Sequence, residues 1–290
     1  MEAKITYLVA NYNNGRFIKD CIESLHAQTS PAWHCLIGDD GSTDDSIALI
    51  QPWLNEKIEL VVNERNLGKS LTLARLIAQS PTDIVGILDP DDALYPAATA
   101  AVLAAYAQAP QVGFVYTNCA KYSLDLQTII APGSSAAIPA GQTTLTGIFV
   151  DAMRTFRISF YRRTVGYDER ILYAEDRDLI YKMEEVTPFV FVDQVLYKYR
   201  QVPGSHTNSP EKRRIGIKNH RLAYCNALRR RKIRGIKKLF YLFYFNERYT
   251  DRRRTPSFLL AVAQRIKHFW LHDQTPGKRH RVEKMVQTIQ

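Results

Sequence analysis

The sequence predicts an α/β protein with a mostly parallel central sheet, followed by a basic helical region. Short apolar runs typical of buried strands alternate with amphipathic segments along the first 120 residues. The charge also divides the chain. Residues 1–200 carry 17 Lys and Arg against 24 Asp and Glu, a net −7, whereas residues 201–290 carry 22 against 5, a net +17. This asymmetry excludes an evenly basic coat and indicates an anionic surface as partner of the C-terminal region.

The expected strands and helices of the first part alternate along the chain. The expected strands are Ile5–Ala10, His34–Gly38, Ile58–Asn63, Asp83–Leu88 and Val112–Asn118. The expected helices are Phe17–Ala27, Ser46–Leu54, Lys69–Gln79 and Ala97–Gln108. Pro96 suits the first turn of the last of these helices. Ligands of such parallel sheets bind at the carboxyl ends of the strands.

The pattern loosens beyond residue 120. Turn residues interrupt Lys121–Thr146, and Ile148–Tyr161 reads as a helical segment followed by a strand. A helix is expected at Glu175–Glu185 and a strand at Phe189–Tyr199. Both the charge and the pattern change near residue 208. We therefore expect an α/β domain over residues 1–208 and a basic helical region over residues 209–290.

Bulk composition excludes several protein classes. The hydrophobic content of 46% is enough for a buried core, and the four cysteines lack the spacing of a zinc site or a disulfide scaffold. The N-terminus does not resemble a signal peptide. The longest apolar run, Leu239–Phe245, is shorter than the roughly 18 residues of a membrane span. The expected location is cytoplasmic, either soluble or peripheral on the inner face of a membrane.

Acidic residues gather at three expected element ends. Helix capping explains Asp44 and Asp45, because Asp side chains accept hydrogen bonds from the free N–H groups of a helix start. It explains residues 89–92 poorly, since three carboxylates within four positions repel one another. A cation relieves that repulsion, and such an oxygen-rich set suits Mg²⁺ or Mn²⁺ shared with a diphosphate. Glu175 and Asp176, at the start of a helix, fit either a cap or a catalytic role.

Five motifs in order resemble family 2 glycosyltransferases, over roughly residues 4–200. They are Val9-Ala10-Asn11-Tyr12-Asn13-Asn14, Ile22-Glu23-Ser24-Leu25 with Gln28-Thr29, Gly38-Asp39-Asp40-Gly41-Ser42-Thr43-Asp44, Asn66-Leu67-Gly68 with Leu88-Asp89-Pro90-Asp91-Asp92, and Gly166-Tyr167-Asp168-Glu169 with Glu175-Asp176. The resemblance implies a GT-A fold, an inverting mechanism and a nucleoside-diphosphate sugar as donor, with a UDP-sugar expected.

The resemblance also implies roles in binding the donor nucleotide. It assigns to that task Ala10, Tyr12, Asp39, Asp40, Lys69, Arg75, Asp89 and Asp91. Tyr12 would stack on the base, and Asp40 would accept a hydrogen bond from an imide N–H. Lys69 and Arg75 would approach the diphosphate.

A metal ion and a general base complete the implied site. Asp91 and Asp92 are both candidate ligands of Mn²⁺ or Mg²⁺, and His206 is a further candidate in the segment after the last strand. Arg200 could equally pair with phosphate or with a carboxylate. Asp176 would be the general base of a single displacement, kept ionised by its place at a helix start. The sequence departs from the usual pattern at Pro90, which replaces a small residue within the DxD motif.

Partners follow from the charge and from the resemblance. The acceptor would be a hydroxyl of a glycan or a lipid-linked molecule in surface polysaccharide or glycolipid synthesis. The basic C-terminal region suits helices on an anionic membrane, but its apolar side could instead dock on the α/β domain or on a second subunit. No nucleic-acid-binding module is recognisable.

Two alternative functions remain. A sugar nucleotidyltransferase would carry a glycine-rich basic loop after the first strand, which residues 11–16 match poorly. A non-catalytic membrane- or nucleic-acid-binding adaptor would not need the intact Asp91, Asp92 and Asp176.

Overall fold

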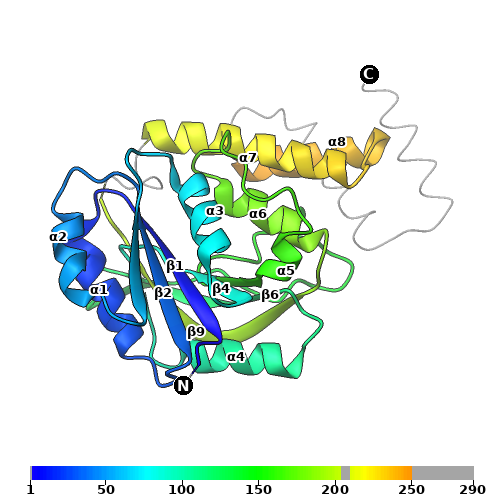
Figure 1. Cartoon of the computed structure of the whole chain (residues 1–290). Coiled ribbons are helices and arrows are strands. Elements are labelled where there is room, and N and C mark those ends of the chain that lie inside the picture. The colour runs from blue at the N-terminus through cyan, green and yellow to red at the C-terminus, as the bar shows by residue number, and fades with distance from the viewer. Residues whose placement is uncertain (1, 204–209, 250–290) are drawn as a thin grey trace.

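Nine strands form one mixed sheet in the computed structural model, which describes residues 2–203 and 210–249 (Figure 1). The spatial order is β3-β2-β1-β4-β8-β6-β9-β5, with β7 paired to β6. The strands are β1 (Ile5–Asn11), β2 (Trp33–Asp39), β3 (Ile58–Val62), β4 (Ile84–Ile87), β5 (Ala93–Leu94), β6 (Phe114–Tyr122), β7 (Ile129–Pro132), β8 (Arg154–Arg157) and β9 (Phe189–Arg200).

The first four long strands run parallel, as the alternating pattern predicts. β1 pairs with both β2 and β4, and its last residue, Asn11, lies beside Asp39, the last residue of β2. Asp39 in turn lies beside Val62 of β3. The carboxyl ends of these strands therefore meet at one edge of the sheet, which we call the site edge.

β8 runs antiparallel between β4 and β6. Its first residue, Arg154, pairs with Ile87 at the end of β4 and with Tyr116 of β6. The expectation of a helix followed by a strand over residues 148–161 is wrong in its order. The strand comes first, and the short helix α5 (Ile158–Tyr161) follows it. Because β8 runs antiparallel to β4, its first residue, Arg154, lies at the site edge.

Helices cover both faces of the sheet, because alternate residues of the buried strands point to opposite sides. On β1, Tyr7 and Val9 belong to the core under α1 and α4, whereas Leu8 belongs to the core under α3 and α6. The helices of this part are α1 (Gly15–His26), α2 (Ser46–Ile50) with the 3₁₀ turn η1 (Gln51–Trp53), α3 (Lys69–Gln79), α4 (Ala98–Gln108) and α6 (Glu175–Glu184).

Asp44 binds the starts of α1 and α2, beside residues 39–42 after β2, which we call the first acidic turn. Its Oδ1 accepts a hydrogen bond from the Ser46 amide at the start of α2, at 3.1 Å, and its Oδ2 accepts one from the Gly15 amide at the start of α1, at 3.0 Å. The capping interpretation is thus confirmed for Asp44. Asp45 is the residue before α2 but makes no capping bond with its side chain.

Two C-terminal helices pack on the α/β domain. α7 (Pro210–Arg230) and α8 (Gly235–Tyr249) share a third core with α6, in which Tyr181, Tyr224 and Phe245 are buried. Tyr224 donates a hydrogen bond to the carbonyl of Leu145 at 2.9 Å. For residues 210–249 the helical prediction is confirmed, and their apolar side docks on the α/β domain. Residues 250–290 and the expected boundary at 208 lie outside the described residues.

The helices of the described part of the chain are too short or too polar to cross a membrane, since none of them combines the length and the apolar character that crossing a bilayer requires.

Candidate functional site

The first acidic turn follows β2 and buries both of its carboxylates. Asp39 is fully buried. It accepts hydrogen bonds from the Asn11 side-chain amide and from the Ser42 backbone amide, both at 2.9 Å. These bonds fasten the end of β1 to the turn. Asp39 therefore lies at the site edge, as predicted, with its oxygens already bonded inside the protein.

Asp40 is held even more completely. Its oxygens accept bonds from the Asn63 side-chain amide and from the backbone amides of Leu67 and Gly68, each at 2.8 Å. A carboxylate offers about four acceptor positions, so one remains for a ligand. Gly68, with φ of 90°, supplies the left-handed backbone that this sharp approach to α3 requires. Asp40 therefore ties the β3–α3 loop to the end of β2.

A hollow of about 600 Å³ opens beside this loop. Arg75 of α3 lines it and donates hydrogen bonds to the carbonyl of Val62, at 3.1 Å, and to the side-chain oxygen of Asn63. That Arg75 approaches the diphosphate together with Lys69 stays a prediction. Its guanidinium is engaged at the end of β3, on the same side as the first acidic turn.

The loop after β1 is exposed next to this turn. Tyr12 is 44% exposed, and Asn13 adopts a left-handed φ of 53°. The Asn13 side chain accepts a hydrogen bond from the Thr43 amide at 2.8 Å, which ties the loop to the acidic turn. Ala10 lies beside Gly38 in the strand pair. An exposed aromatic ring thus stands at the site edge, two residues after Ala10.

The second acidic turn carries its charge differently. Asp89 follows β4 and pairs with Lys69, the first residue of α3, at 2.6 Å. The Lys69 ammonium also lies 3.6 Å from a Glu175 oxygen. Burial opposes ionisation of Asp89, but Lys69 and Arg154 together outweigh burial and lower the pKa of that carboxyl. Lys69 therefore connects the turn to the start of α6.

The remaining aspartates of this turn point to different environments. Asp92 is 2% exposed and accepts hydrogen bonds from the Tyr197 hydroxyl and from the Arg200 amide, both at 2.7 Å. Asp91 is only partly buried, and burial together with Asp89 raises the pKa of its carboxyl. Both oxygens of Asp92 are thus bonded to β9, so its role as a metal ligand stays a prediction, and Asp91 is the more accessible of the two candidates.

Arg200 anchors the second turn from below. It is almost fully buried, it pairs with Asp20 at 2.6 Å, and it donates to the backbone carbonyls of Asp91 and Leu124. Of the two roles open to Arg200 in the sequence, the structure shows the carboxylate pair. The backbone of the turn that presents Asp91 is thus held by Arg200, a side chain of the protein itself.

Asp176 lies in the first turn of α6, as predicted. Its Oδ2 accepts a hydrogen bond from the Arg154 guanidinium at 3.0 Å, and its Oδ1 accepts one from the Arg177 amide at 2.7 Å. Burial raises the pKa of Asp176, but Arg154 and Arg177 outweigh burial, so the pKa lies below its ordinary value. Asp176 is therefore ionised at neutral pH, as a general base must be.

Left-handed backbone precedes both members of this pair. Met153, with φ of 56°, comes directly before Arg154, and Tyr173, with φ of 61°, precedes the helix that carries Asp176. Non-glycine residues in this region cost free energy and cluster at functional sites. The two strained residues support the view that the Arg154–Asp176 geometry is maintained for chemistry.

Sequence reasoning missed Arg154, and it placed Glu175 in the motif at the start of α6 without giving it a role of its own. Burial raises the pKa of Glu175 and Lys69 opposes this. Arg154 has a raised pKa because Asp176 and Asp89 outweigh its burial. No motif surrounds Arg154. In the sequence it is marked only by being a basic residue within a short strand-like run.

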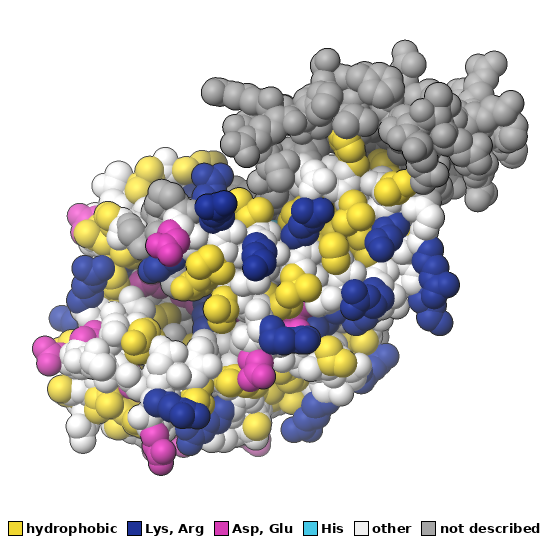
Figure 2. Space-filling model, turned by 90° about the horizontal axis from the view of Figure 1, so that it is seen from above, with side chains coloured by type: hydrophobic (Ala, Val, Ile, Leu, Met, Phe, Trp, Pro, Cys, Tyr) yellow, Lys and Arg dark blue, Asp and Glu magenta, His cyan; other side chains and the backbone are white. Residues whose placement is uncertain are grey.

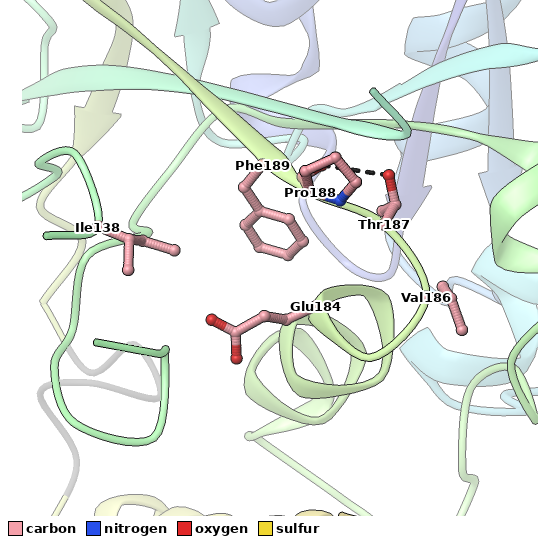
Figure 3. Close-up of a pocket in the computed structure, with 6 residues that line it drawn as sticks. All are labelled: Ile138, Glu184, Val186, Thr187, Pro188 and Phe189. Carbon is pink, nitrogen blue, oxygen red and sulfur yellow. Dashed lines mark hydrogen bonds between the residues drawn. The ribbon is translucent and has the colours of Figure 1, made fainter. Parts of the chain in front are cut away.

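Another hollow, of about 450 Å³, lies at the opposite end of the sheet (Figure 3). Phe189 lines it, and this residue pairs with Phe114 at the start of β6. Glu184, its one charged lining residue, is already engaged by the Thr144 hydroxyl, at 2.7 Å, and by Arg231, at 2.7 Å. The charged groups described above do not reach this hollow.

The described side chains that could bind a metal ion are few at the site edge. Among residues 2–203 and 210–249, no three His, Cys, Asp or Glu side chains cluster so as to enclose a metal. Mg²⁺, however, is often held by one or two carboxylates together with substrate phosphates. Asp91 is the partly exposed carboxylate that fits this arrangement, while His206 lies outside the described residues.

Comparison with known proteins identifies the family. The model of glycosyl transferase family 2 matches residues 6–165, more than half of the chain. The chain belongs to this family. Chondroitin synthase from Escherichia coli is 28% identical over 239 residues, covering 82% of this chain and 34% of the relative. Hyaluronan synthase from Pasteurella multocida is 26% identical over 230 residues, covering 79% and 23%. The chain thus spans about a third or less of these two relatives.

Solved structures support the fold. TarS 1–349 from S. aureus, in complex with UDP-GlcNAc, superposes with a TM-score of 0.62 at 14% identity, covering 98% of this chain and 92% of that one. The mannosyltransferase PcManGT from Pyrobaculum calidifontis, with GDP-Man and Mn²⁺, gives 0.62 at 18% identity, covering 100% and 81%. The expected GT-A fold with a helical extension is confirmed.

Proposed function

We propose that the protein is an inverting glycosyltransferase that moves a sugar from a nucleoside-diphosphate sugar, expected to be a UDP-sugar, to an acceptor hydroxyl. The observation that carries this proposal is the joining of three elements at the site edge. Lys69 links Asp89 of the second acidic turn to Glu175, and the next residue, Asp176, is an ionised carboxylate. Charged groups that can bind a diphosphate and a carboxylate that can act as a base thus lie side by side.

The nucleoside would lie over the first acidic turn. Tyr12 is exposed there and offers a ring on which a base can stack. The remaining acceptor position on Asp40 suits an imide N–H, and the hollow lined by Arg75 extends the same region. The diphosphate would then reach Lys69 and Asp91, which follow along the site edge.

A divalent cation, Mn²⁺ or Mg²⁺, would be held by Asp91 and by the diphosphate, and when bound it supplies compensation for charge on the leaving nucleoside diphosphate. The residues of this chain prepare that arrangement. Arg200 and Tyr197 hold the turn rigid from inside. Burial, and after it the neighbouring Asp89, raise the pKa of Asp91, and a bound cation would offset the negative charge of this pair.

Asp176 would take the proton of the acceptor hydroxyl as the hydroxyl oxygen bonds to the anomeric carbon. The bond from that carbon to the diphosphate oxygen breaks at the opposite face, and the electron pair leaves with the nucleoside diphosphate. One carboxylate is sufficient for this single displacement, which inverts the anomeric configuration. Lys69 and Arg154 would stabilise the negative charge that develops on the departing group.

Polysaccharide or glycolipid synthesis is the setting that the relatives favour. The two curated relatives named above are synthases of chondroitin and hyaluronan, and each exceeds this chain in length. A glycan or a lipid-linked molecule is therefore the proposed acceptor. The nucleotidyltransferase alternative is not favoured, because the loop after β1 is occupied by Asn13 bonding rather than by a glycine-rich cradle.

Thermal-shift binding of UDP, GDP, CDP and TDP, each with and without Mn²⁺, tests the donor site. We expect one nucleotide, foremost UDP, to raise the melting temperature, and Mn²⁺ to increase that rise. Absence of metal-dependent stabilisation by all four nucleotides would contradict the proposal.

A further inference from the structure

The outward side of α7 carries a row of basic residues. Arg214, Lys218, Arg221 and Arg229 are all exposed, and we call these four the basic stripe. On a helical projection they lie opposite the buried Ala223 and Ala227, which pack on α6, whereas the buried Tyr224 and Leu228 flank them on one side. The stripe extends over about 23 Å at 1.5 Å per residue. Packing of Ala223 and Ala227 on the other side thus leaves the stripe as a band along the outward side of α7.

Charge pairing separates the stripe from the other arginines of the same helix. Arg230 pairs with Glu185 at 2.7 Å, and Arg231, just beyond the helix, pairs with Glu184 at 2.7 Å. Within residues 2–203 and 210–249, no ion pair involves the four stripe residues. The acidic residue of α7 itself is Glu211, in its first turn. The stripe therefore keeps its positive charge available to a partner.

Aliphatic side chains are interspersed with these charges. Ile215 is 38% exposed and Leu222 is 42% exposed, and both lie on the outward side of the helix. An interface of lipid headgroups accommodates this mixture, because Lys and Arg reach the phosphates while the aliphatic groups enter the boundary of the acyl region. Nucleic-acid backbones offer the phosphates but no apolar layer for the aliphatic groups.

The stripe lies on the same side of the molecule as the site edge. β1 starts near the N-terminus at the bottom of Figure 1, so its carboxyl end points toward α7 at the top. Seen from that side, Lys and Arg gather over one half of the face and Asp and Glu mostly over the other (Figure 2). α7 also holds the loop before α6, since the Asn219 side chain donates to the Leu172 carbonyl at 2.9 Å.

We propose that the basic stripe of α7 docks on an anionic lipid bilayer. The bilayer would then face the side on which the site edge opens, and α7 would connect it to the loop that precedes Asp176. This inference concerns a surface that is separate from the donor site, and it stands whether or not UDP is the donor nucleotide.

Vesicle flotation with the full chain tests the proposal. The vesicles are phosphatidylcholine alone, or phosphatidylcholine with about 30% phosphatidylglycerol, at two salt concentrations. We expect binding to the anionic vesicles only, and weaker binding at high salt. Lys218→Gln with Arg221→Gln should weaken this binding roughly 30-fold, because each basic residue near an anionic surface contributes about a factor of five.

The matched control is Arg230→Gln with Arg231→Gln, which removes the same charge from the end of α7 and the residue after it. Its vesicle binding should stay near that of the wild type, since both arginines face α6 glutamates. If losing those pairs unfolds the protein, Lys4→Gln with Lys19→Gln is the second control, because both lysines are exposed on other elements. Residues 250–290 are present in every variant, so the difference reports the stripe.

Three results would overturn the proposal. One is equal binding to neutral and anionic vesicles. Another is unchanged vesicle binding in the stripe variant. The third is a stripe variant that loses binding to duplex DNA while it keeps vesicle binding, which would assign the stripe to nucleic acid instead.

Discussion

The two acidic turns at the site edge are similar in sequence and opposite in their use of carboxylates. In the first, Asp39 and Asp40 accept bonds from neutral amides, and both are buried. In the second, Asp89 faces a cation, while Asp91 is partly exposed. Hydrogen bonds from neutral amides fix the loop and leave few carboxylate lone pairs for a ligand. The Lys69–Asp89 ion pair and the accessible Asp91, in contrast, can exchange their partners for the charges of a substrate. We therefore propose that the first run mainly builds the edge and that Asp89 and Asp91 of the second run handle charge, while Asp92 is bonded inward like the first run.

The largest effect should come from the charged side of this comparison. Asp176→Asn should reduce the turnover number about a thousandfold, because proton transfer by a positioned base contributes roughly 10²–10⁴. Nucleotide binding should be retained, since Asp176 is proposed to contact the acceptor. Initial rates of UDP release with acceptor present, together with UDP titration, measure the two quantities. Sugar transfer at the wild-type rate in Asp176→Asn would show that Asp176 is not the general base.

A change in the first acidic turn should lower the free energy of unfolding. Asp40→Asn places an amide group against the backbone amides of Leu67 and Gly68, so we expect a loss of about 2 kcal/mol in the free energy of unfolding. For a chain of this size that corresponds to a fall of roughly 4–8 °C in melting temperature. Asp45→Asn is the control, because Asp45 is exposed and makes no capping bond. Equal melting temperatures for both variants would break the comparison.

A smaller effect is expected in the pH dependence. Burial raises the pKa of Asp176, and Arg154 is the first of the groups that lower it, so Arg154→Gln should move this pKa upward. The acid limb of the rate profile should move upward by about one pH unit or more. Arg157→Gln on the same strand is the control, because Arg157 pairs with Asp83 at the start of β4. Rate profiles between pH 4 and 8 that coincide for wild type and Arg154→Gln would show that the pair does not tune the base.

Much of the fold and part of the site could be predicted from the sequence. Alternating periods predicted the parallel strands, and their carboxyl ends marked the site edge before any contact was known. The bounds expected for α6 agree with the structure to one residue. These features depend on local patterns of apolar and polar residues, and such patterns are visible along the chain.

The missed features depend on contacts between distant segments. Arg154 meets Asp176 only because β8 inserts antiparallel between β4 and β6. Asp92 turns inward because β5 pairs with β9, which brings Tyr197 and Arg200 to it. The direction of Arg75, in contrast, was predictable, since six helical positions after Lys69 place it on another face of α3.

Titration of UDP with and without Mn²⁺, in wild type and in Asp91→Asn, tests most directly the claim that the second turn handles the charge. We predict that Mn²⁺ strengthens UDP binding about tenfold or more in the wild type, and that Asp91→Asn keeps the fold and the weak metal-free binding but loses this enhancement. An Asp91→Asn variant in which Mn²⁺ still strengthens UDP binding to the wild-type extent would contradict the account.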